Sequence, residues 1–144
     1  MRDILFRGKE PNTGKWVYGY VVSVADKSRC TIYVPQDPND FNWATLPVAV
    51  DPDTVGQFTG LCDKNGAKIF EGDILKTYFG KFGYSKAVVK YGKGDFSCGA
   101  HFFYGWVFRD LEKNEELRMN YNDARYVSEY EVFGNIHDNP ELLS

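Results

Sequence analysis

Runs of alternating apolar residues, separated by glycine-containing turns, recur along most of this chain and constrain its fold more than any other feature. In the run at 84–91, alternate positions separate a mainly apolar face from a face that carries lysines, as in a half-buried strand. Turn signals stand at Asn65-Gly66, at Gly72, at 80–83 and at 92–94, where glycine and asparagine accept the backbone angles of tight turns. The pattern predicts strands joined by hairpins, with little helix.

The composition agrees with a strand-rich globular domain. The 144 residues include 10 Tyr, 11 Phe and 3 Trp, and large rings favour pleated surfaces. We expect one mostly β domain over residues 1–144, with 1–50 as a semi-independent N-terminal β layer and 55–140 curled into a small barrel. The opening layer should contain a hairpin formed by strands at 3–8 and 16–24.

Three segments are expected to form helical turns or loops. Residues 110–120 have fair helix propensity but a weak apolar face, so a short helix and a loop are both open. Near the C-terminus, Asn139 before Pro140 predicts one last helical turn, because these residues suit the first positions of a helix. Proline, asparagine and aspartate at 35–43 predict an exposed loop.

The charge of the chain is small but unevenly distributed. The net charge of −3 gives no global electrostatic argument for nucleic-acid binding. Residues 64–93 carry seven lysines against two acidic residues, whereas residues 109–131 carry seven acidic residues against four basic ones. These stretches are either solvated surface or complementary patches that meet between subunits.

The sequence gives no indication of export or of a membrane. The N-terminus lacks the apolar region of a signal peptide, and no apolar run approaches the ~18 residues of a membrane span. Cys30, Cys62 and Cys98 are far apart and odd in number, as in proteins of a reducing compartment. We therefore expect a cytoplasmic protein without membrane contact.

The sequence contains no convincing catalytic, cofactor or metal site. The two histidines, His101 and His137, have neither an H-x3-H partner nor a cysteine pair nearby, whereas zinc needs three or four ligands. Residues 63–66 begin like a calcium loop, but the glycine comes too early for an EF-hand, so a hairpin turn is preferred. Glu71 and Asp73 are spaced for acid–base work, yet they flank a turn glycine. We expect no catalytic residue, no metal ligand, no cofactor and no enzymatic activity.

The most apolar stretch, residues 101–108, is the strongest functional indication. Both of its faces are largely apolar, which is typical of a strand that is central in the fold or covered by a partner. The candidate interface residues are Phe102, Tyr104, Trp106 and Phe108. As an alternative, exposed rings could stack on single-stranded nucleic acid while nearby lysines contact phosphates. The candidate lysines are Lys81, Lys86, Lys90 and Lys93, although the absence of arginine from 64–93 weakens this alternative.

Three sequence motifs carry a family resemblance. They are FRGK at 6–9 with WVYG at 16–19, VGQFTGLCDKNGAKIFEGDIL at 55–75, and EVFGNIHDNPELL at 131–143. Read together, they resemble the YopX family of phage and prophage proteins. The resemblance implies a short phage-encoded protein of undetermined biochemical role, with a mostly β fold that includes an SH3-like barrel.

The residues of these motifs are typical of a scaffold. Glycines stand at expected turns or strand kinks, and isoleucines stand at expected core positions. They are Gly60, Gly66, Gly72 and Gly134, with Ile69, Ile74 and Ile136. We therefore expect a non-enzymatic cytoplasmic protein of the bacterial host that acts by protein–protein contact. A homo-oligomer is the first expectation, a host or phage protein is a second partner, and nucleic acid is the alternative.

Overall fold

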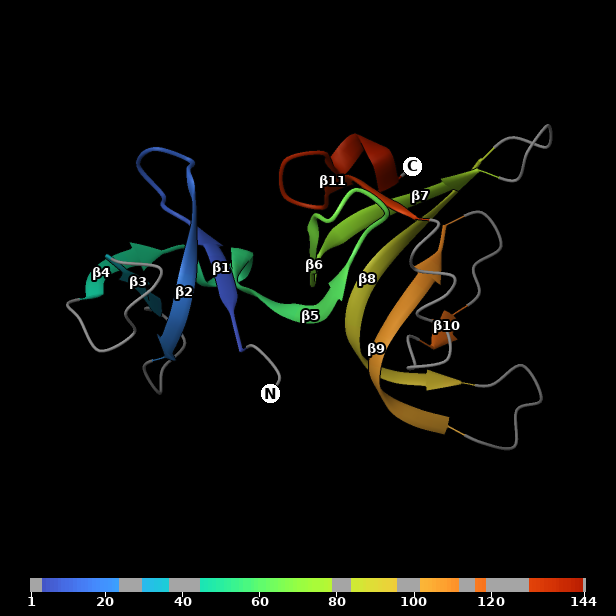
Figure 1. Cartoon of the computed structure of the whole chain (residues 1–144), viewed down its shortest axis with the longest axis horizontal. Coiled ribbons are helices and arrows are strands. Elements are labelled where there is room, and N and C mark those ends of the chain that lie inside the picture. The colour runs from blue at the N-terminus through green and yellow to red at the C-terminus, as the bar shows by residue number, and fades with distance from the viewer. Residues whose placement is uncertain are drawn as a thin grey trace. The chain divides into compact units, whose positions relative to one another are not determined.

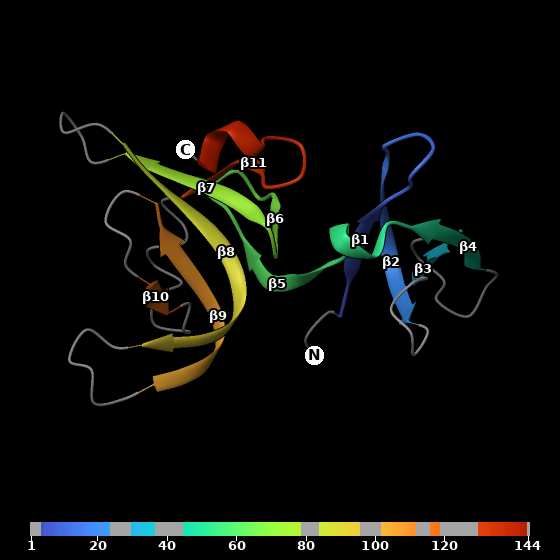
Figure 2. The same cartoon turned by 180° about the vertical axis from the view of Figure 1, so that it is seen from behind.

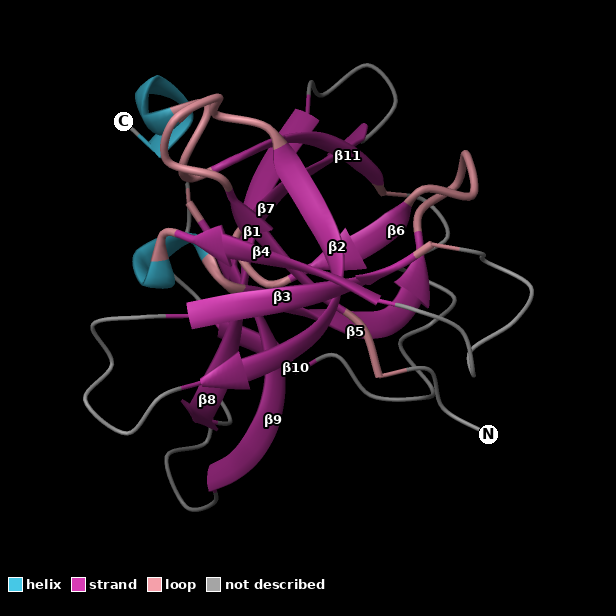
Figure 3. Ribbon diagram, turned by 90° about the vertical axis from the view of Figure 1, so that its left-hand side faces the viewer, coloured by secondary structure: helices cyan, strands magenta, loops and turns pink. Residues whose placement is uncertain are grey.

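The computed structural model describes residues 4–23, 30–36, 45–78, 84–95, 102–111, 116–118 and 130–143. These ranges consist mainly of strands and include two single-turn 3₁₀ helices, so the mostly β prediction is confirmed (Figure 1 and Figure 3). The strands are β1 (Phe6–Lys9), β2 (Trp16–Ser23), β3 (Cys30–Pro35), β4 (Thr45–Val50), β5 (Gly56–Cys62), β6 (Lys68–Phe70), β7 (Asp73–Tyr78), β8 (Tyr84–Asp95), β9 (Phe102–Asp110), β10 (Glu116–Arg118) and β11 (Glu131–Asn135). The 3₁₀ turns are η1 (Pro52–Thr54) and η3 (Pro140–Leu143).

The strands belong to two sheets, one in the order β4-β3-β2-β1-β5-β6 and the other in the order β10-β9-β8-β7-β11. Within the described ranges neither order returns to its first strand, so these pairings form no closed barrel. By contacts the chain divides into two compact units, Met1–Phe58 and Thr59–Ser144, and β5 contributes residues to both. A single domain with a layer at 1–50 and a barrel at 55–140 stays a prediction.

The first unit contains the predicted opening hairpin, formed by β1 and β2, and β3 pairs with the other edge of β2. On one face of β2, Val17 and Val21 pack against a buried cluster, which consists of Cys30, Ile32 and Val50. Successive side chains of a strand point to opposite faces. Tyr18 and Tyr20 therefore face away from this core, and they are 45% and 41% exposed.

Gly19 lies where β2 and β3 approach each other closely. A Cβ atom at this position would overlap the Tyr33 carbonyl oxygen and lie 3.1 Å from Cγ2 of Ile32. Because the obstacle includes backbone, a side chain here would have to push the strands apart.

The core of the second unit lies on β6, β7 and β8. Its fully buried members are Ile69, Leu75, Ala87 and Val89. In β8 the buried Ala87 and Val89 alternate with the half-buried Lys86, Val88 and Lys90, which confirms the pattern predicted for 84–91.

The two turns of the central motif are confirmed. The Gly66 backbone N–H donates to the Asp63 carbonyl at 3.0 Å, and the Asp63 N–H donates to the Ala67 carbonyl at 2.8 Å, which closes the hairpin turn. Gly66 has φ +82° and Gly72 has φ +88°, in the left-handed region that favours glycine.

Two predictions about the later segments were wrong. Where a turn was expected, β8 continues through residues 92–94 to Asp95, and Gly92 pairs with Gly105 on β9. Glycine weakens a strand but lets it bend, and β8 and β9 are strongly curved (Figure 2). Within 110–120, residues 116–118 form β10 and pair with β9, because sheet pairing overrides weak helix propensity.

The last helical turn, η3, is confirmed. The predicted loop at 35–43 and turn at 80–83 lie largely outside the described residues.

Candidate functional site

Beyond the core, β8 and β9 continue as a two-stranded ribbon, residues 91–95 paired with residues 102–106, which we call the β8–β9 ribbon. In the described part of the chain, β7 is in register with β8 only as far as Val88, and β10 is in register with β9 only from Val107 onward. The ribbon therefore has no third strand among these residues. A two-stranded hairpin is only marginally stable by itself, so a surface that covers one face would stabilise it.

Tyr91 is the described side chain that makes the ribbon a candidate surface. It follows Val89 on the same face of β8, yet Val89 is 1% exposed and Tyr91 is 60% exposed. Its cross-strand partner is Trp106. Directly opposed residues share a face, so the core face of the sheet continues into the ribbon, where the Tyr91 ring is open to solvent.

The four predicted interface residues all lie on β9, in register with β8. Phe108 lies opposite Val89, Trp106 opposite Tyr91, Tyr104 opposite Lys93, and Phe102 opposite Asp95. The side chains at 102–108 lie outside the described part of the structure, so their role at an interface stays a prediction. Tyr91 is not among the interface residues predicted from the sequence, although its position two residues after Val89 on an apolar face was a usable signal.

The predicted nucleic-acid lysines are divided among different environments. The Lys86 Nζ donates to the Leu142 carbonyl at 3.0 Å and so holds η3 against the sheet. Lys90 is half-buried on the face of β8 opposite Tyr91. Lys81 and the side chain of Lys93 lie outside the described residues.

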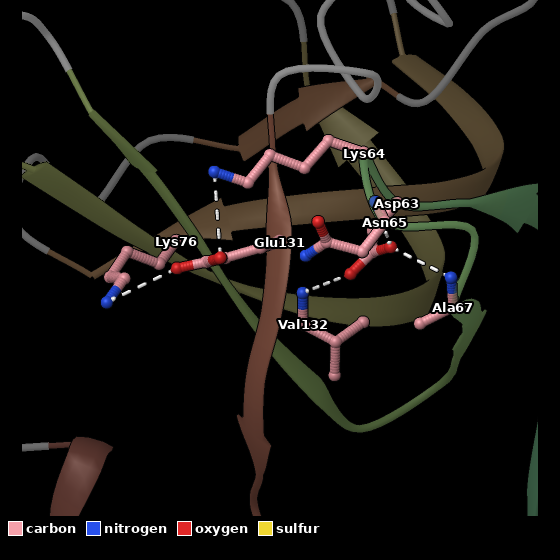
Figure 4. A network of polar contacts seen from close by, with 7 residues as sticks. All are labelled: Asp63, Lys64, Asn65, Ala67, Lys76, Glu131 and Val132. Atoms are coloured by element: carbon pink, nitrogen blue, oxygen red, sulfur yellow. Dashed lines mark hydrogen bonds and ion pairs between the residues drawn. The ribbon is translucent and has the colours of Figure 1, made fainter.

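Part of the basic stretch is paired with the acidic stretch of the same chain. Lys64 and Lys76 lie 3.6 and 3.4 Å from the carboxylate oxygens of Glu131 (Figure 4). The Lys76 ammonium also lies 4.2 Å from the centroid of the Phe133 ring. At these positions the complementary charges meet within one chain.

Asp63 connects the turn after β5 to β11. Its Oδ1 accepts the backbone N–H groups of Asn65 at 2.8 Å and Ala67 at 2.9 Å, and its Oδ2 accepts that of Val132 at 2.8 Å (Figure 4). Both carboxylate oxygens are therefore used by backbone donors. This is the arrangement of a structural turn, whereas a calcium loop directs such oxygens to the ion.

The ionisation of Asp63 is coupled to these contacts. Burial alone would raise the pKa of this carboxyl. The N–H groups of Val132, Ala67 and Asn65, together with the charge of Lys64, outweigh burial and hold the pKa of Asp63 below its ordinary value. The folded protein therefore stabilises the ionised form.

Gly72 joins the central motif to the closing motif. Its backbone N–H donates to the Val89 carbonyl at 2.8 Å, and its carbonyl accepts the N–H of Ile136 at 2.9 Å. A Cβ atom on Gly72 would lie 3.5 Å from Cγ1 of Ile136. The left-handed backbone conformation, with φ +88°, explains why glycine suits the turn, because the Cβ distance by itself is an ordinary contact distance.

The closing motif folds around the buried Asn135. Its Oδ1 accepts the backbone N–H groups of His137 at 3.0 Å and Asp138 at 2.9 Å. The backbone N–H of Asn135 donates to Oδ1 of Asn139 at 3.3 Å. The Asn139 side chain therefore contacts the last residue of β11. Asp63, Gly72 and Asn135 thus all act on the backbone of the second unit, and the motifs form a scaffold.

Asp73, which was considered for acid–base work, and the buried Cys30 both have structural surroundings. Asp73 is 1% exposed, and its Oδ2 accepts the Phe70 N–H at 2.8 Å, which supports the turn interpretation. Burial raises the pKa of the Cys30 thiol and outweighs the hydrogen bond from the Thr31 backbone, so this thiol is protonated at neutral pH. No three His, Cys, Asp or Glu side chains gather as metal ligands would in the part of the chain that the structure describes.

The family described as YopX protein matches residues 5–144. The chain belongs to the YopX family. The match extends from β1 to η3 and includes all three motifs, so the predicted resemblance is confirmed.

The fold of this YopX member is similar to that of protein EF1440 from Enterococcus faecalis, known from a crystal structure. The two chains are 24% identical, the alignment covers 100% of each, and the TM-score is 0.54. At this identity the likeness concerns the fold alone. A comparison with curated proteins finds no match. None of the described helical segments is long and apolar enough to cross a membrane.

Proposed function

We propose that this YopX protein is a non-enzymatic protein–protein binding module that self-associates through the β8–β9 ribbon. The observation that carries the proposal is the exposure of Tyr91, at 60%, on the continuation of a buried sheet face and opposite Trp106. Exposed apolar surface next to a core commonly marks an interaction site.

A second copy of the chain is a suitable occupant because the ribbon is the same on both copies. Two ribbons can pack face to face around a twofold axis, each covering the rings of the other. Tyrosine and tryptophan are enriched in such contacts. A host or phage protein is the other partner to test.

Three finer features belong to the same proposal: phage origin, the cytoplasm of a bacterial host, and an SH3-like barrel. Family membership supports the phage origin. The few, widely spaced cysteines support the cytoplasm, and the strong curvature of β8 and β9 supports the barrel (Figure 1). Nucleic acid on the lysines of 64–93 is disfavoured, because Lys64, Lys76 and Lys86 contact groups of their own chain.

Sedimentation velocity over a range of protein concentrations tests self-association. The wild-type protein should form a species heavier than the 16.5 kDa chain. Tyr91→Asp should shift it to monomer, because a carboxylate on the ring face would be buried without a partner. Tyr18→Asp changes an exposed tyrosine of the first unit and should leave the distribution unchanged.

A wild-type protein that sediments as a monomer at every concentration would overturn the proposal. So would association that survives both Tyr91→Asp and Trp106→Asp in folded protein. Retained thermal unfolding of the Tyr91→Asp variant separates loss of association from loss of the fold.

A further inference from the structure

The outward face of the β1–β2 hairpin combines aromatic rings with cations. Trp16, Tyr18 and Tyr20 alternate along β2, and in the register Arg7 lies opposite Tyr18 and Lys9 opposite Trp16. The Arg7 guanidinium lies 4.5 Å from the centroid of the Trp16 ring, and the Lys9 ammonium lies 5.6 Å from it. Two cations and three rings therefore occupy one continuous face.

The strands that form this surface contain no carboxylate. The sequences of β1 to β4 include Arg7 and Lys9 but neither aspartate nor glutamate. The adjoining turn adds the exposed Lys15 and one acid, Glu10, whose Oε2 accepts the Thr13 hydroxyl at 3.1 Å. Although the net charge of the whole chain is −3, the described residues of this hairpin carry three cations against one acid, and Asp51, whose backbone N–H donates to the Lys9 carbonyl at 2.8 Å, adds one acid beside β1.

We propose that this face binds single-stranded nucleic acid. Tyr18 and Tyr20 are 45% and 41% exposed, and alternate strand residues are roughly 6.7 Å apart. This spacing is about twice the 3.4 Å rise of a stacked strand, so each ring can receive one base of an extended chain. A flat-faced polyanion fits rings and cations together better than an uncharged apolar partner does.

The cations have different roles in this site. Lys9 is half-buried and Lys15 exposed, and both contact phosphates. Arg7 is 6% exposed and stacks on Trp16, so it is a positioning residue that fixes the ring. The site lies entirely in the first unit, and its test is independent of the β8–β9 ribbon.

Fluorescence anisotropy with a labelled oligothymidylate of about 15 nucleotides tests the proposal, a length near the upper end of single-site footprints. Wild-type protein should bind at low salt, with log affinity falling against log salt by roughly 0.7 per phosphate contact. Lys9→Gln should reduce that slope by about 0.7. Tyr18→Ala and Tyr20→Ala should each weaken binding by roughly 5- to 150-fold, the equivalent of one stacked base.

Phe133→Ala is the matched control, since Phe133 is an exposed strand aromatic of the second unit that lies outside the β8–β9 ribbon, and it should leave oligonucleotide binding unchanged. Absence of binding at low salt would overturn the proposal. An equal loss in Phe133→Ala and Tyr18→Ala would also overturn it, as would salt-independent binding. A change of sedimentation in Tyr18→Ala with unaltered oligonucleotide affinity would show a protein contact instead. Because the salt slope of Lys9→Gln needs no change of a ring, it decides the question if the tyrosine variants unfold.

Discussion

Replacing Asp63 by asparagine should destabilise the second unit while changing little of its shape. The side chain keeps its size, and one oxygen can still accept the N–H groups of Asn65 and Ala67. The other position becomes an amide NH₂, which faces the N–H of Val132 with a second donor. The bond between the turn and β11 is therefore lost.

The cost follows from the kind of bond that is removed. A hydrogen bond to a charged group contributes about 1.5–3 kcal/mol, and the N–H of Val132 is left opposite a donor. We expect Asp63→Asn to lower the free energy of unfolding by about 2–4 kcal/mol, a large part of the ~5–15 kcal/mol of a typical domain. Asp63→Ala, which removes all three bonds, should cost about 3–5 kcal/mol.

The same hydrogen bonds predict how the loss of unfolding free energy in Asp63→Asn depends on pH. Since the folded protein lowers the pKa of Asp63, its stabilisation is complete above the unfolded pKa of about 3.9. It is lost as the pH falls through the folded pKa. The gap between wild type and Asp63→Asn should thus be constant near neutral pH and narrow below about pH 4.

Guanidinium denaturation followed by circular dichroism and tryptophan fluorescence measures this gap, with Trp106 as the tryptophan of the second unit. Asp53→Asn is the control, because that aspartate is exposed and its replacement should change stability by less than about 0.5 kcal/mol. A variant at Asp63 as stable as wild type at pH 7, or a gap that persists undiminished at pH 2–3, would refute the reasoning.

Two glycine substitutions test the turn and the strand approach. Gly66→Val should lower the free energy of unfolding by about 1–3 kcal/mol, because no atom lies within 4 Å of its Cβ position and the cost comes from φ +82° alone. Gly66→Asn should cost less in the same denaturation experiment, and equal costs would contradict this explanation. Gly19→Ala should destabilise the first unit by about 2 kcal/mol or more, since its Cβ meets the Tyr33 carbonyl. If hydrogen exchange in β2 and β3 of the Gly19→Ala variant is unchanged, the two strands have room for a Cβ atom at this position and the reasoning is contradicted.

The features predicted correctly from sequence are those set by neighbouring residues. The faces of β8 follow from alternation around Ala87 and Val89, and the turn at Asn65-Gly66 follows from the positive φ that glycine accepts. The three motifs by themselves indicate the family. In each case a short stretch of chain contains the physical cause.

The features missed depend on residues far apart in the sequence. The glycines at 92 and 94 predict a turn from the local sequence. Only the pairing of Gly92 with Gly105 on β9 shows that the strand continues. Likewise, the pairing of Glu116 with Arg109 cannot be read from the helix propensity of 110–120. The bond from Val132 to Asp63 spans 69 residues, so the sequence identified a turn aspartate but not its link to β11.

Hydrogen–deuterium exchange at low and high protein concentration tests the central claim, self-association through the β8–β9 ribbon, most directly. Peptides covering β8 and β9 should exchange more slowly at high concentration, because the partner copy covers the face that carries Tyr91. Peptides covering β2 and β3 serve as the internal reference and should exchange at the same rate at both concentrations. Protection of β8 and β9 that does not change with concentration would contradict the account.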